Sequence, residues 1–339
     1  MRKALALLSG GLDSLLAAKL IMNQGLHVEG INFFTGFSGV GCVCIKRENK
    51  SLHNASWVAD QLGIKLHVVD VVAEFQKVLA NPQYGYGAHL NPCLDCKRFM
   101  VMQAFAWMKE NAFDFLVTGE VIGQRPMSQR KDTLPIVAKN TDDLLLRPLC
   151  AKLLPISLPE REGWVNRDLL CNFSGRSRKP QMALAQQFGF TEYPQPAGGC
   201  ILTDEFYTKR LRDLWKWQGP ENKNYTLEDI MLLQVGRHLR PDAESNFKVI
   251  VGRDQLENEC LEKYKDRYIS MYSSSHIGPV VLCVGEMNAA NMELAAKITA
   301  YFGKGRQAES VQITVDIPKE TSKNLNIIPI PEIPSKWYI

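Results

Sequence analysis

A six-residue turn near the N-terminus has the composition of a phosphate-binding loop. Two serines and two glycines occur in the stretch Ser9-Gly10-Gly11-Leu12-Asp13-Ser14. Glycine has no Cβ atom, so an anion can approach the main chain closely, and serine hydroxyls can donate to phosphate oxygens. Asp13 fits either a helix cap or a Mg²⁺ ligand that bridges to phosphate. The stretch matches neither Walker A nor G-x-G-x-x-G. It predicts a phosphate site of another kind, with a capped turn lacking a ligand as the alternative.

Cysteines form the second group of residues that suggests chemistry. Cys93 and Cys96 have C-x2-C spacing, which suits zinc, an iron–sulfur cluster or dithiol chemistry. Among the nine cysteines no second pair of this type occurs, and Cys200 lies in a separate turn that contains Gly198 and Gly199. Three thiolates would bind a [4Fe–4S] cluster with one iron left open. Two of them, Cys96 and Cys200, would instead suit a persulfide relay. Cys42 and Cys44 are spaced poorly for one metal, and their role stays open.

The elements around these residues alternate between short apolar strands and helices. Strands are predicted at 4–8, 27–34, 65–69, 114–117 and 144–149, with helices at 12–22, 51–62 and 98–109 among them. This alternation predicts an α/β fold with a doubly wound parallel sheet. Ligands of such sheets bind at the carboxyl ends of the strands. The turn at 9–14 is therefore expected at that edge, with Phe34 beside it near a nucleotide base.

After residue 203 the sequence changes character, and a smaller domain is expected. A basic-aromatic helix at 206–217 precedes strands at 247–251, 280–284 and 311–315 and a helix at 288–302, which together predict an α+β domain over 204–318. Residues 319–339 contain three spaced prolines and are expected to form an irregular tail. The helix at 206–217 is predicted to bind RNA phosphates through Lys209, Arg210, Arg212 and Lys216. The alternative is that this helix only packs between domains.

Size and composition limit the remaining possibilities. The chain has 339 residues, 45% of them hydrophobic, and a formal net charge of +4, which permits a nucleic-acid partner without requiring one. No stretch approaches a membrane span. The cysteines are therefore expected in a reducing cytoplasm, as metal ligands, nucleophiles or buried residues rather than as disulfides.

The Ser9–Ser14 stretch resembles the PP-loop of ATP pyrophosphatases. Members of this family adenylate a carbonyl-type oxygen with ATP and release pyrophosphate. The resemblance implies ATP and Mg²⁺ as cofactors. Phosphate contacts are implied for Ser9, Gly10, Gly11, Asp13 and Ser14, and Asp13 is also expected to act in catalysis.

Two groups of tRNA-modifying enzymes share further motifs with residues 1–203. Asn91-Pro92-x3-Cys96 followed by Thr118-Gly119 is similar to the tRNA 2-thiouridylases, in which Cys96 and Cys200 would match the two catalytic cysteines. The run from Thr118 through Gly119, Glu120, Gly123 and Gln124 to Ser128-Gln129, together with Leu146-Arg147-Pro148-Leu149, resembles tRNA 4-thiouridine synthases. This likeness implies that Gly119 and Gln124 lie at the nucleotide.

The sequence also departs from both groups. It shows neither a THUMP-type RNA module nor a rhodanese tail, and Cys93 stands where the thiouridylases often have Asp. The extra cysteine favours a cluster ligated by Cys93, Cys96 and Cys200. Residues 234–315, with Gly236-Arg237-His238 and Val251-Gly252-Arg253, are similar to the RNA-binding domain of NFACT proteins.

These likenesses predict a tRNA sulfurtransferase that adenylates a uridine and replaces its oxygen by sulfur. The longer match of the 123–129 loop favours 4-thiouridine, with 2-thiouridine as the alternative. Expected partners are tRNA and a sulfur donor, either a cysteine desulfurase or inorganic sulfide, while the oligomeric state, including a homodimer, stays open. The other hypotheses are a different PP-loop ligase, such as a zinc-containing deazaguanine-nitrile synthase, and an RNA-binding protein with a degenerate nucleotide fold.

Overall fold

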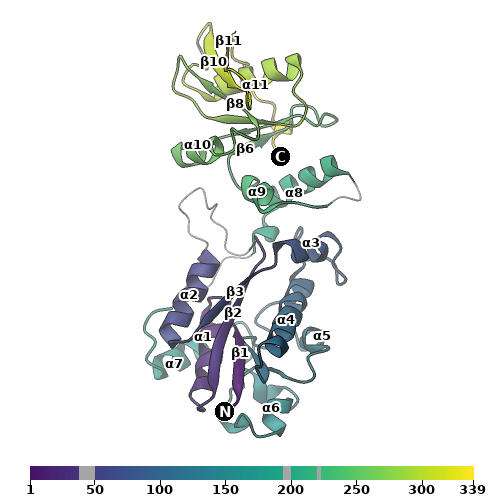
Figure 1. Cartoon of the computed structure of the whole chain (residues 1–339), viewed down its shortest axis with the longest axis vertical. Helices are drawn as coiled ribbons and strands as arrows, with labels where there is room; N and C mark the ends of the chain where they lie inside the picture. The colour runs from purple at the N-terminus through teal and green to yellow at the C-terminus, as the bar shows by residue number, and fades with distance from the viewer. Residues whose placement is uncertain (38–49, 194–199, 220–222) are drawn as a thin grey trace. The chain divides into compact units, whose positions relative to one another are not determined.

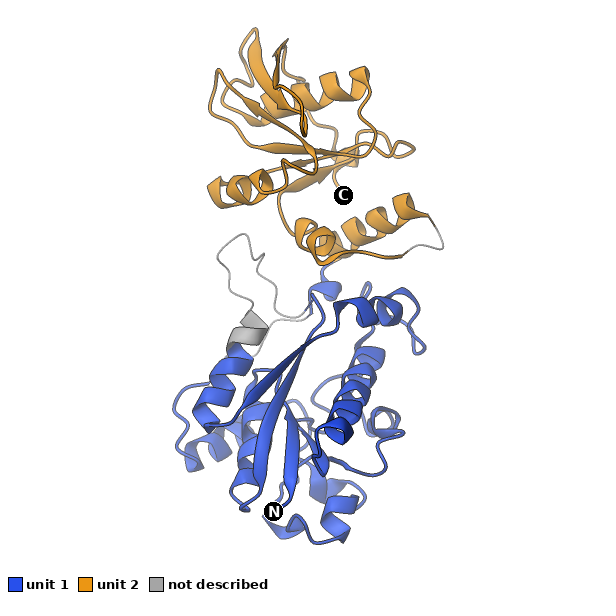
Figure 2. Ribbon diagram, viewed as in Figure 1, with its two compact units in different colours: residues 1–40, 48–204 blue, residues 41–47, 205–339 orange. Residues whose placement is uncertain are grey.

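The computed structural model describes residues 1–37, 50–193, 200–219 and 223–339, which divide into two compact units (Figure 2). Unit 1 holds the described residues up to Asp204, and unit 2 holds those from Glu205 to Ile339. Cys42, Cys44 and the Gly198-Gly199 turn lie outside the described residues. Each unit has its own hydrophobic core.

Unit 1 is built on a five-stranded sheet in which every pairing is parallel. Its strand order is β3-β2-β1-β4-β5. The strands are β1 Lys3–Leu7, β2 His27–Phe34, β3 Leu66–Asp70, β4 Phe115–Thr118 and β5 Leu145–Leu146. The chain leaves β1 toward β2 on one side and later returns to β4 on the other, so the order switches between β1 and β4. This arrangement confirms the predicted doubly wound sheet and places its ligand-binding crevice at the carboxyl ends of β1 and β4.

Helices cover both faces of this sheet (Figure 1). The side chains of β1 alternate between the two layers: Ala4 and Ala6 pack with α1, α2 and α7, whereas Leu5 packs with α4 and α5. This alternation follows from the two-residue period of a strand. The helices are α1 Leu12–Met22, α2 Lys50–Leu62, α3 Val72–Ala80, α4 Cys93–Glu110, α5 Leu134–Ala138, α6 Leu158–Arg161 and α7 Lys179–Gln187, with short 3-10 turns η1 Ala151–Leu153, η2 Arg167–Leu169 and η3 Ile201–Thr203.

Helix α4 begins earlier than the sequence pattern predicts. The pattern favours a start at Arg98, but the helix begins at Cys93. The Asp95 carboxylate accepts hydrogen bonds from the backbone N–H groups of Gln83 and Tyr84 at 2.9 and 3.0 Å, which fastens the preceding loop to the first turn. The C-x2-C pair therefore lies on a helix rather than in a loop.

Unit 2 is an antiparallel six-stranded sheet of order β11-β10-β8-β9-β7-β6. Helix α11 packs against Val249 and Val251 of β7, whereas Ile250 packs with α9 and α10 on the opposite face. The elements are α8 Glu205–Gln218, α9 Leu227–Leu232, β6 Arg237–Leu239, β7 Lys248–Val251, α10 Gln255–Glu262, β8 Ile269–Ser273, β9 Val281–Val284, α11 Ala289–Phe302, β10 Val311–Asp316, β11 Lys323–Ile327 and η4 Ser335–Trp337. Among the described helices of the whole chain, none is long and apolar enough to cross a membrane.

The expected irregular tail is wrong for residues 323–327. These residues form β11, which pairs with β10 so that Ile327 lies opposite Val311. The last residues also join the sheet, because Arg240 N–H donates to the Trp337 carbonyl at 2.8 Å. The prolines that suggested disorder follow β11 and leave its hydrogen bonds intact.

Candidate functional site

The turn after β1 leaves the N-terminus of α1 open. Gly10 has φ +77°, and a Cβ atom there would lie 2.5 Å from Asn54 Cβ of α2, so only glycine fits. Gly11 is the N-cap of α1 and supplies no side-chain cap. Ser14 donates its hydroxyl to the Gly11 carbonyl at 2.8 Å. The first N–H groups of the helix are therefore left for an anion, and the helix dipole favours one there.

A second loop, which follows β4, lies directly against this turn. A Cβ atom on Gly119 would lie 2.5 Å from the Asp13 carbonyl carbon and 2.6 Å from the Ser14 nitrogen, so this contact also requires glycine. Phe34 ends β2, the other neighbour of β1, and is partly buried. The predicted nucleotide residues thus lie at the carboxyl ends of three adjacent strands.

Asp13 has one carboxylate oxygen bound and the other free. Its Oδ2 accepts from Gln124 Nε2 at 2.6 Å, and its Oδ1 is buried without a partner. Burial raises the pKa of the Asp13 carboxyl, although the hydrogen bond from Gln124 and the charges of Arg178 and Arg125 oppose the shift. A buried carboxylate with an unpartnered oxygen beside a phosphate cradle suits Mg²⁺, whose ligands are carboxylate and phosphate oxygens.

The three predicted cysteines come together near the same loops. Cys93 and Cys96 lie in the first turn of α4, where a spacing of three residues places them on one side. Cys93 Sγ lies 3.6 Å from Ser128 Oγ in the loop after β4. Cys200 Sγ lies 3.9 Å from the Phe37 carbonyl after β2.

Cys96 and Cys200 are buried thiols that lie within electrostatic range of neighbouring cysteines. Burial raises the pKa of Cys96 far above its usual range, and the charges that Cys200 and Cys93 would carry as thiolates raise it further. Burial also raises the pKa of Cys200 to about 11, although a hydrogen bond from the Leu202 backbone and the charge of Arg125 oppose this. Arg125 therefore acts on both Cys200 and Asp13, which links the cysteines to the phosphate cradle.

The predicted iron–sulfur ligand set does not fit the side-chain arrangement. Across the described residues, no group of three or more histidine, cysteine or acidic side chains is placed to hold a metal ion. Cys93 instead approaches Ser128, and Cys200 approaches the Phe37 carbonyl. The prediction of a three-cysteine cluster site is therefore not supported.

A buried ion pair, not predicted from the sequence, supports the loop after β4. Arg147 Nε donates to Glu120 Oε2 at 2.8 Å, with side chains only 7% and 1% exposed. Arg147 also donates to the Leu134 carbonyl, and Thr118 Oγ1 to Glu120 Oε2. Burial opposes the charged form of Glu120, but the charges of Arg147 and Lys97 prevail and lower its pKa. In the sequence, Arg147 belongs to the Leu146–Leu149 motif, and this motif was the signal that could have indicated its role in supporting the loop after β4.

The basic residues of α8 make packing contacts within unit 2. Lys209 donates to the Tyr338 carbonyl, Arg210 to the Leu233 carbonyl and Lys216 to the Ala243 carbonyl, each at 2.8 Å. Asp213 on the same helix pairs with the buried Arg240 and Lys248. These contacts support a packing role for α8. RNA binding by Lys209, Arg210, Lys216 and the exposed Arg212 stays a prediction.

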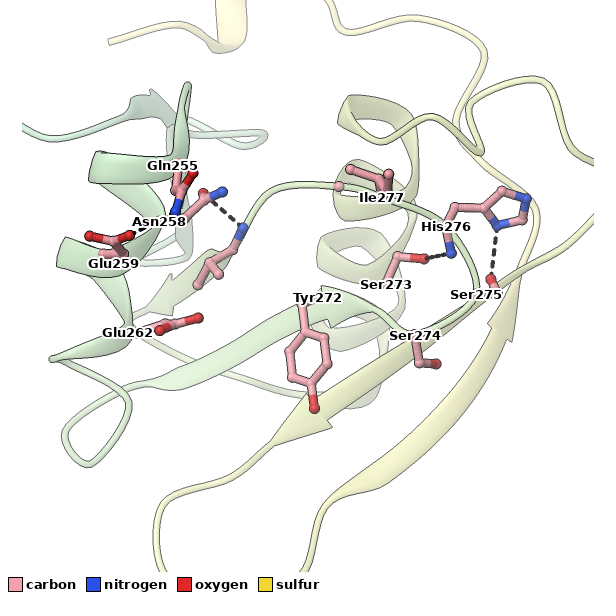
Figure 3. Close-up of a pocket in the computed structure, with 12 residues that line it drawn as sticks. Gln255, Asn258, Glu259, Glu262, Tyr272, Ser273, Ser274, Ser275, His276 and Ile277 are labelled. Atoms are coloured by element: carbon pink, nitrogen blue, oxygen red, sulfur yellow. Dashed lines mark hydrogen bonds between the residues drawn. The ribbon is translucent and has the colours of Figure 1, made fainter.

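A depression of about 650 Å³ lies in unit 2 between α10 and the loop after β8 (Figure 3). Glu259 and Glu262 line one side of it, and Tyr272 lines another. Its serines are already bonded: Ser273 Oγ accepts from His276 N–H at 3.0 Å, and Ser275 Oγ contacts His276 Nδ1. Two carboxylates make this depression unsuited to a polyphosphate, whereas the turn after β1 in unit 1 leaves helix N–H groups open to an anion.

Family models match both units. Residues 2–143 match the model described as tRNA methyl transferase HUP domain, and residues 236–338 match the NFACT protein RNA binding domain. These matches confirm the predicted resemblance of the N-terminal unit to PP-loop proteins of tRNA modification and of the C-terminal unit to NFACT.

Curated relatives are tRNA-specific 2-thiouridylases. The chain is 31% identical to the MnmA protein of Pseudomonas savastanoi pv. phaseolicola over 252 residues, 70% of this chain and 60% of that protein. It is 26% identical to the enzyme of Carboxydothermus hydrogenoformans over 261 residues, 70% of this chain and 64% of that protein. The chain thus spans about three fifths of the length of the relatives that it matches.

Solved structures are more distant. A 4-thiouridine synthetase–RNA complex with bound ATP aligns with 57% of this chain and 54% of that chain, at 19% identity and a TM-score of 0.34. The C-terminal part of the fibronectin/fibrinogen-binding protein from Streptococcus suis aligns with 48% of this chain and 77% of that chain, at 15% identity and a TM-score of 0.27.

Proposed function

We propose that this protein is an ATP-dependent tRNA thiouridine synthase. The proposal rests on the groups gathered at one edge of the sheet in unit 1. Asp13, with its unpartnered Oδ1, lies there around the same loops as the thiols of Cys96 and Cys200. An activating nucleotide and a sulfur carrier are the two requirements of uridine thiolation. The 2-thiouridylases that match this chain support the same reaction class.

In the first step the uridine oxygen attacks the α-phosphorus of ATP. An O–P bond forms, and the bond to the leaving pyrophosphate breaks, which gives an adenylated uridine. The Ser9–Ser14 turn and the N-terminus of α1 hold the phosphates. Bound Mg²⁺ would be held by Asp13 and would neutralise charge on the phosphates. Gln124 keeps the Asp13 carboxylate oriented through its hydrogen bond to Oδ2.

In the second step sulfur displaces AMP. A persulfide on Cys96 attacks the activated ring carbon, so a C–S bond forms and the C–O bond to AMP breaks. Cys200 then attacks the Cys96 sulfur, which releases the thiolated base and leaves a Cys96–Cys200 disulfide. The sulfur donor must transfer a sulfane sulfur to the Cys96 thiol to form the persulfide. A dithiol reductant must then reduce the Cys96–Cys200 disulfide to two thiols.

The ring carbon has two candidates. The curated relatives favour carbon 2, because the names printed for them specify 2-thiouridylases. Carbon 4 is the second candidate, favoured by the motif from Thr118 to Gln129, in which Gln124 contacts Asp13. Nucleoside mass spectrometry of tRNA from a strain lacking this protein separates them, because only one of the two thiouridines will be missing.

The variant Asp13→Asn tests the nucleotide step. Losing the charged ligand is expected to slow pyrophosphate release with tRNA and ATP by on the order of a hundredfold, with tRNA affinity nearly unchanged. The exposed carboxylate of Asp142 provides the matched control, Asp142→Asn. Normal turnover of Asp13→Asn would contradict the phosphate assignment. A wild-type protein that thiolates no tRNA with sulfide or with a desulfurase would contradict the function.

Anaerobic purification with iron analysis tests the sulfur step. The persulfide route predicts an iron-free protein that thiolates tRNA and a fully active Cys93→Ala variant, whereas Cys96→Ala and Cys200→Ala should release pyrophosphate without thiolating. Stoichiometric iron together with loss of activity in Cys93→Ala would restore the cluster hypothesis.

A further inference from the structure

The loop at residues 81–91 is fastened to both segments that carry the predicted cysteines, although the proposed mechanism gives it no role. Near its start, the Tyr84 N–H donates to the buried Asp95 carboxylate at 3.0 Å. Asp95 lies in the first turn of α4, between the two cysteines of the C-x2-C pair. Near its end, the Leu90 N–H donates to the Leu202 carbonyl at 3.2 Å, two residues after the third cysteine. Hydrogen bonds thus fix the loop beside the thiols.

The same loop packs against the loop after β4. Gly87 lies so close to Met127 that a Cβ atom on Gly87 would overlap with Met127 Sδ. The next residue, Ser128, is the neighbour of Cys93 Sγ at 3.6 Å. The loop at residues 81–91 is therefore part of the surroundings that a substrate of the cysteines meets.

Tyr84 and Tyr86 of this loop are exposed aromatic residues, at 38% and 37%. The Tyr86 hydroxyl donates to the Leu79 carbonyl at 2.5 Å, which fastens that side chain to the end of α3. Within the described part of the chain the Tyr84 hydroxyl makes no hydrogen bond, so its backbone is fixed while its ring stays available. A cation lies next to it, because Arg98 Nη1 donates to Gln83 Oε1 at 3.3 Å. An exposed ring and a guanidinium thus share one short stretch of surface.

Uridine thiolation places a demand on the surroundings of Cys96. A uridine in folded tRNA is stacked on its neighbours, and it must leave the stack before its ring carbon reaches a protein thiol. Leaving the stack exposes the face of an adjacent base. Proteins that bind splayed-out RNA cover such faces with aromatic rings and contact the nearby backbone through basic side chains. An exposed tyrosine whose backbone is fixed beside the thiols meets this demand.

We propose that Tyr84 stacks on the tRNA base adjacent to the reacting uridine, and that Arg98 binds the phosphate of the same nucleotide. This inference rests on the proposed function and names the part of the substrate that unit 1 holds. Tyr84 is a positioning residue, because it holds a neighbour of the reacting base and touches no reacting atom. Stacking tolerates any base, so the contact positions the uridine without reading the sequence around it.

Filter binding of the full-length protein to tRNA from a strain lacking it, across a salt series, tests this assignment. Tyr84→Ala and Tyr84→Leu are expected to weaken binding about five- to a hundredfold, with the salt dependence unchanged because stacking displaces no counterions. Tyr84→Phe, the matched control, keeps the ring and should bind within about twofold of wild type. Arg98→Ala should instead lower the salt slope by about one, and a wild-type slope in that variant would refute the phosphate contact.

Thermal unfolding and thiolation assays separate the inference from a folding defect and from the proposed function. Tyr84→Ala should unfold like the wild type, because the exposed side chain makes no hydrogen bond within the described residues. Unchanged tRNA affinity in Tyr84→Ala, or an equal loss in Tyr84→Phe, would overturn the inference while wild-type thiolation stands.

The sulfur donor provides a further contrast. If Tyr84→Ala lost thiolation with a desulfurase but kept it with sulfide, at unchanged tRNA affinity, the ring would belong to a contact with the donor protein and the inference would fall. A wild type that needs Tyr84 to bind tRNA but thiolates nothing would overturn only the proposed function.

Discussion

At the scale of single residues, three of the predicted site residues are buried polar groups. The Asp13 carboxylate has one oxygen without a partner, and the Cys96 and Cys200 thiols have raised pKa values because of burial. These groups are costly to bury in charged form. A cation bound at Asp13 would reduce the cost of burying its negative charge. A sulfur acceptor at the cysteines would likewise reduce the cost of burying a thiolate.

The raised pKa of Cys200 makes its alkylation strongly dependent on pH. With a pKa of about 11, only about one thousandth of Cys200 is thiolate at pH 8, and this fraction grows about tenfold per pH unit. We expect the iodoacetamide rate at Cys200, followed by peptide mass spectrometry, to keep rising above pH 10. In urea-unfolded protein the rate should level off near pH 9. A native rate that already levels off near pH 8.5 would show that the thiol is not held in a buried setting.

At the scale of elements, the site depends on loops that distant elements hold in place. Gly119 brings the loop after β4 onto the α1 turn, and Arg147, just after β5, holds Glu120 of the same loop. Strand β5 contains only Leu145 and Leu146, although the apolar pattern predicted a strand to Leu149. The strand ends at a turn in which Cys150 N–H donates to the Arg147 carbonyl at 3.1 Å, and Pro148 within this turn has no N–H for a further ladder hydrogen bond.

Loss of the Arg147–Glu120 pair should destabilise unit 1. Arg147→Met leaves Glu120 buried without its cation, and we expect unfolding free energy to fall by about 3–5 kcal/mol in chemical denaturation. The exposed pair Lys109–Asp142, also at 2.8 Å, is the control, and Lys109→Met should cost about 0–1 kcal/mol.

The same pair predicts a direction for acid sensitivity. The pKa of Glu120 is lowered in the folded state, so its stabilising contribution is full above the unfolded pKa near 4.3 and is lost as pH falls through the lower folded value. Wild type and Arg147→Met should therefore converge in stability as pH falls through the lowered folded pKa of Glu120. Equal stabilities of the two proteins at pH 7 would argue against the pair.

At the scale of the whole molecule, the proposed nucleotide chemistry and the proposed RNA recognition fall in different units. Unit 1 contains the described residues proposed for the nucleotide together with Cys93, Cys96 and Cys200, and unit 2 includes residues 236–338, which match the NFACT RNA-binding domain. Each unit has a separate core, with α8 fastened into unit 2 by Asp213, Arg240 and Lys248. This division predicts that the two binding functions can be separated.

Removal of residues 205–339 tests the division. We expect residues 1–204 to bind ATP with Mg²⁺ within about threefold of the full chain, because the nucleotide site is complete in unit 1. Affinity for tRNA, measured by filter binding across a salt series, should fall at least about tenfold and lose much of its salt dependence. Circular dichroism serves as the folding control. A truncated protein that thiolates tRNA with the full-chain KM would refute a role for unit 2 in RNA binding.

The sequence by itself determined the parts of this protein whose causes are local. The run from Ala4 to Met22 specifies strand, glycine turn and helix through apolar spacing and through the absence of a Cβ atom at Gly10, and the structure has β1, this turn and α1 there. The alternation of strand and helix segments along the chain predicted the parallel α/β class, because this alternation is also visible in local residue patterns. The likeness around Gly119 and Gln124 also implied a place at the nucleotide, and Gly119 does lie against the turn before α1.

Only the tertiary structure decided features that depend on partners far along the chain. Cys93 lies on α4 because Asp95 binds the loop at residues 83 and 84. Residues 323–327 form β11 because they pair with the edge of β10 and Ile327 packs into the core of unit 2. Such contacts arise when burial and hydrogen bonding select one pairing among many, and local residue patterns do not encode that selection.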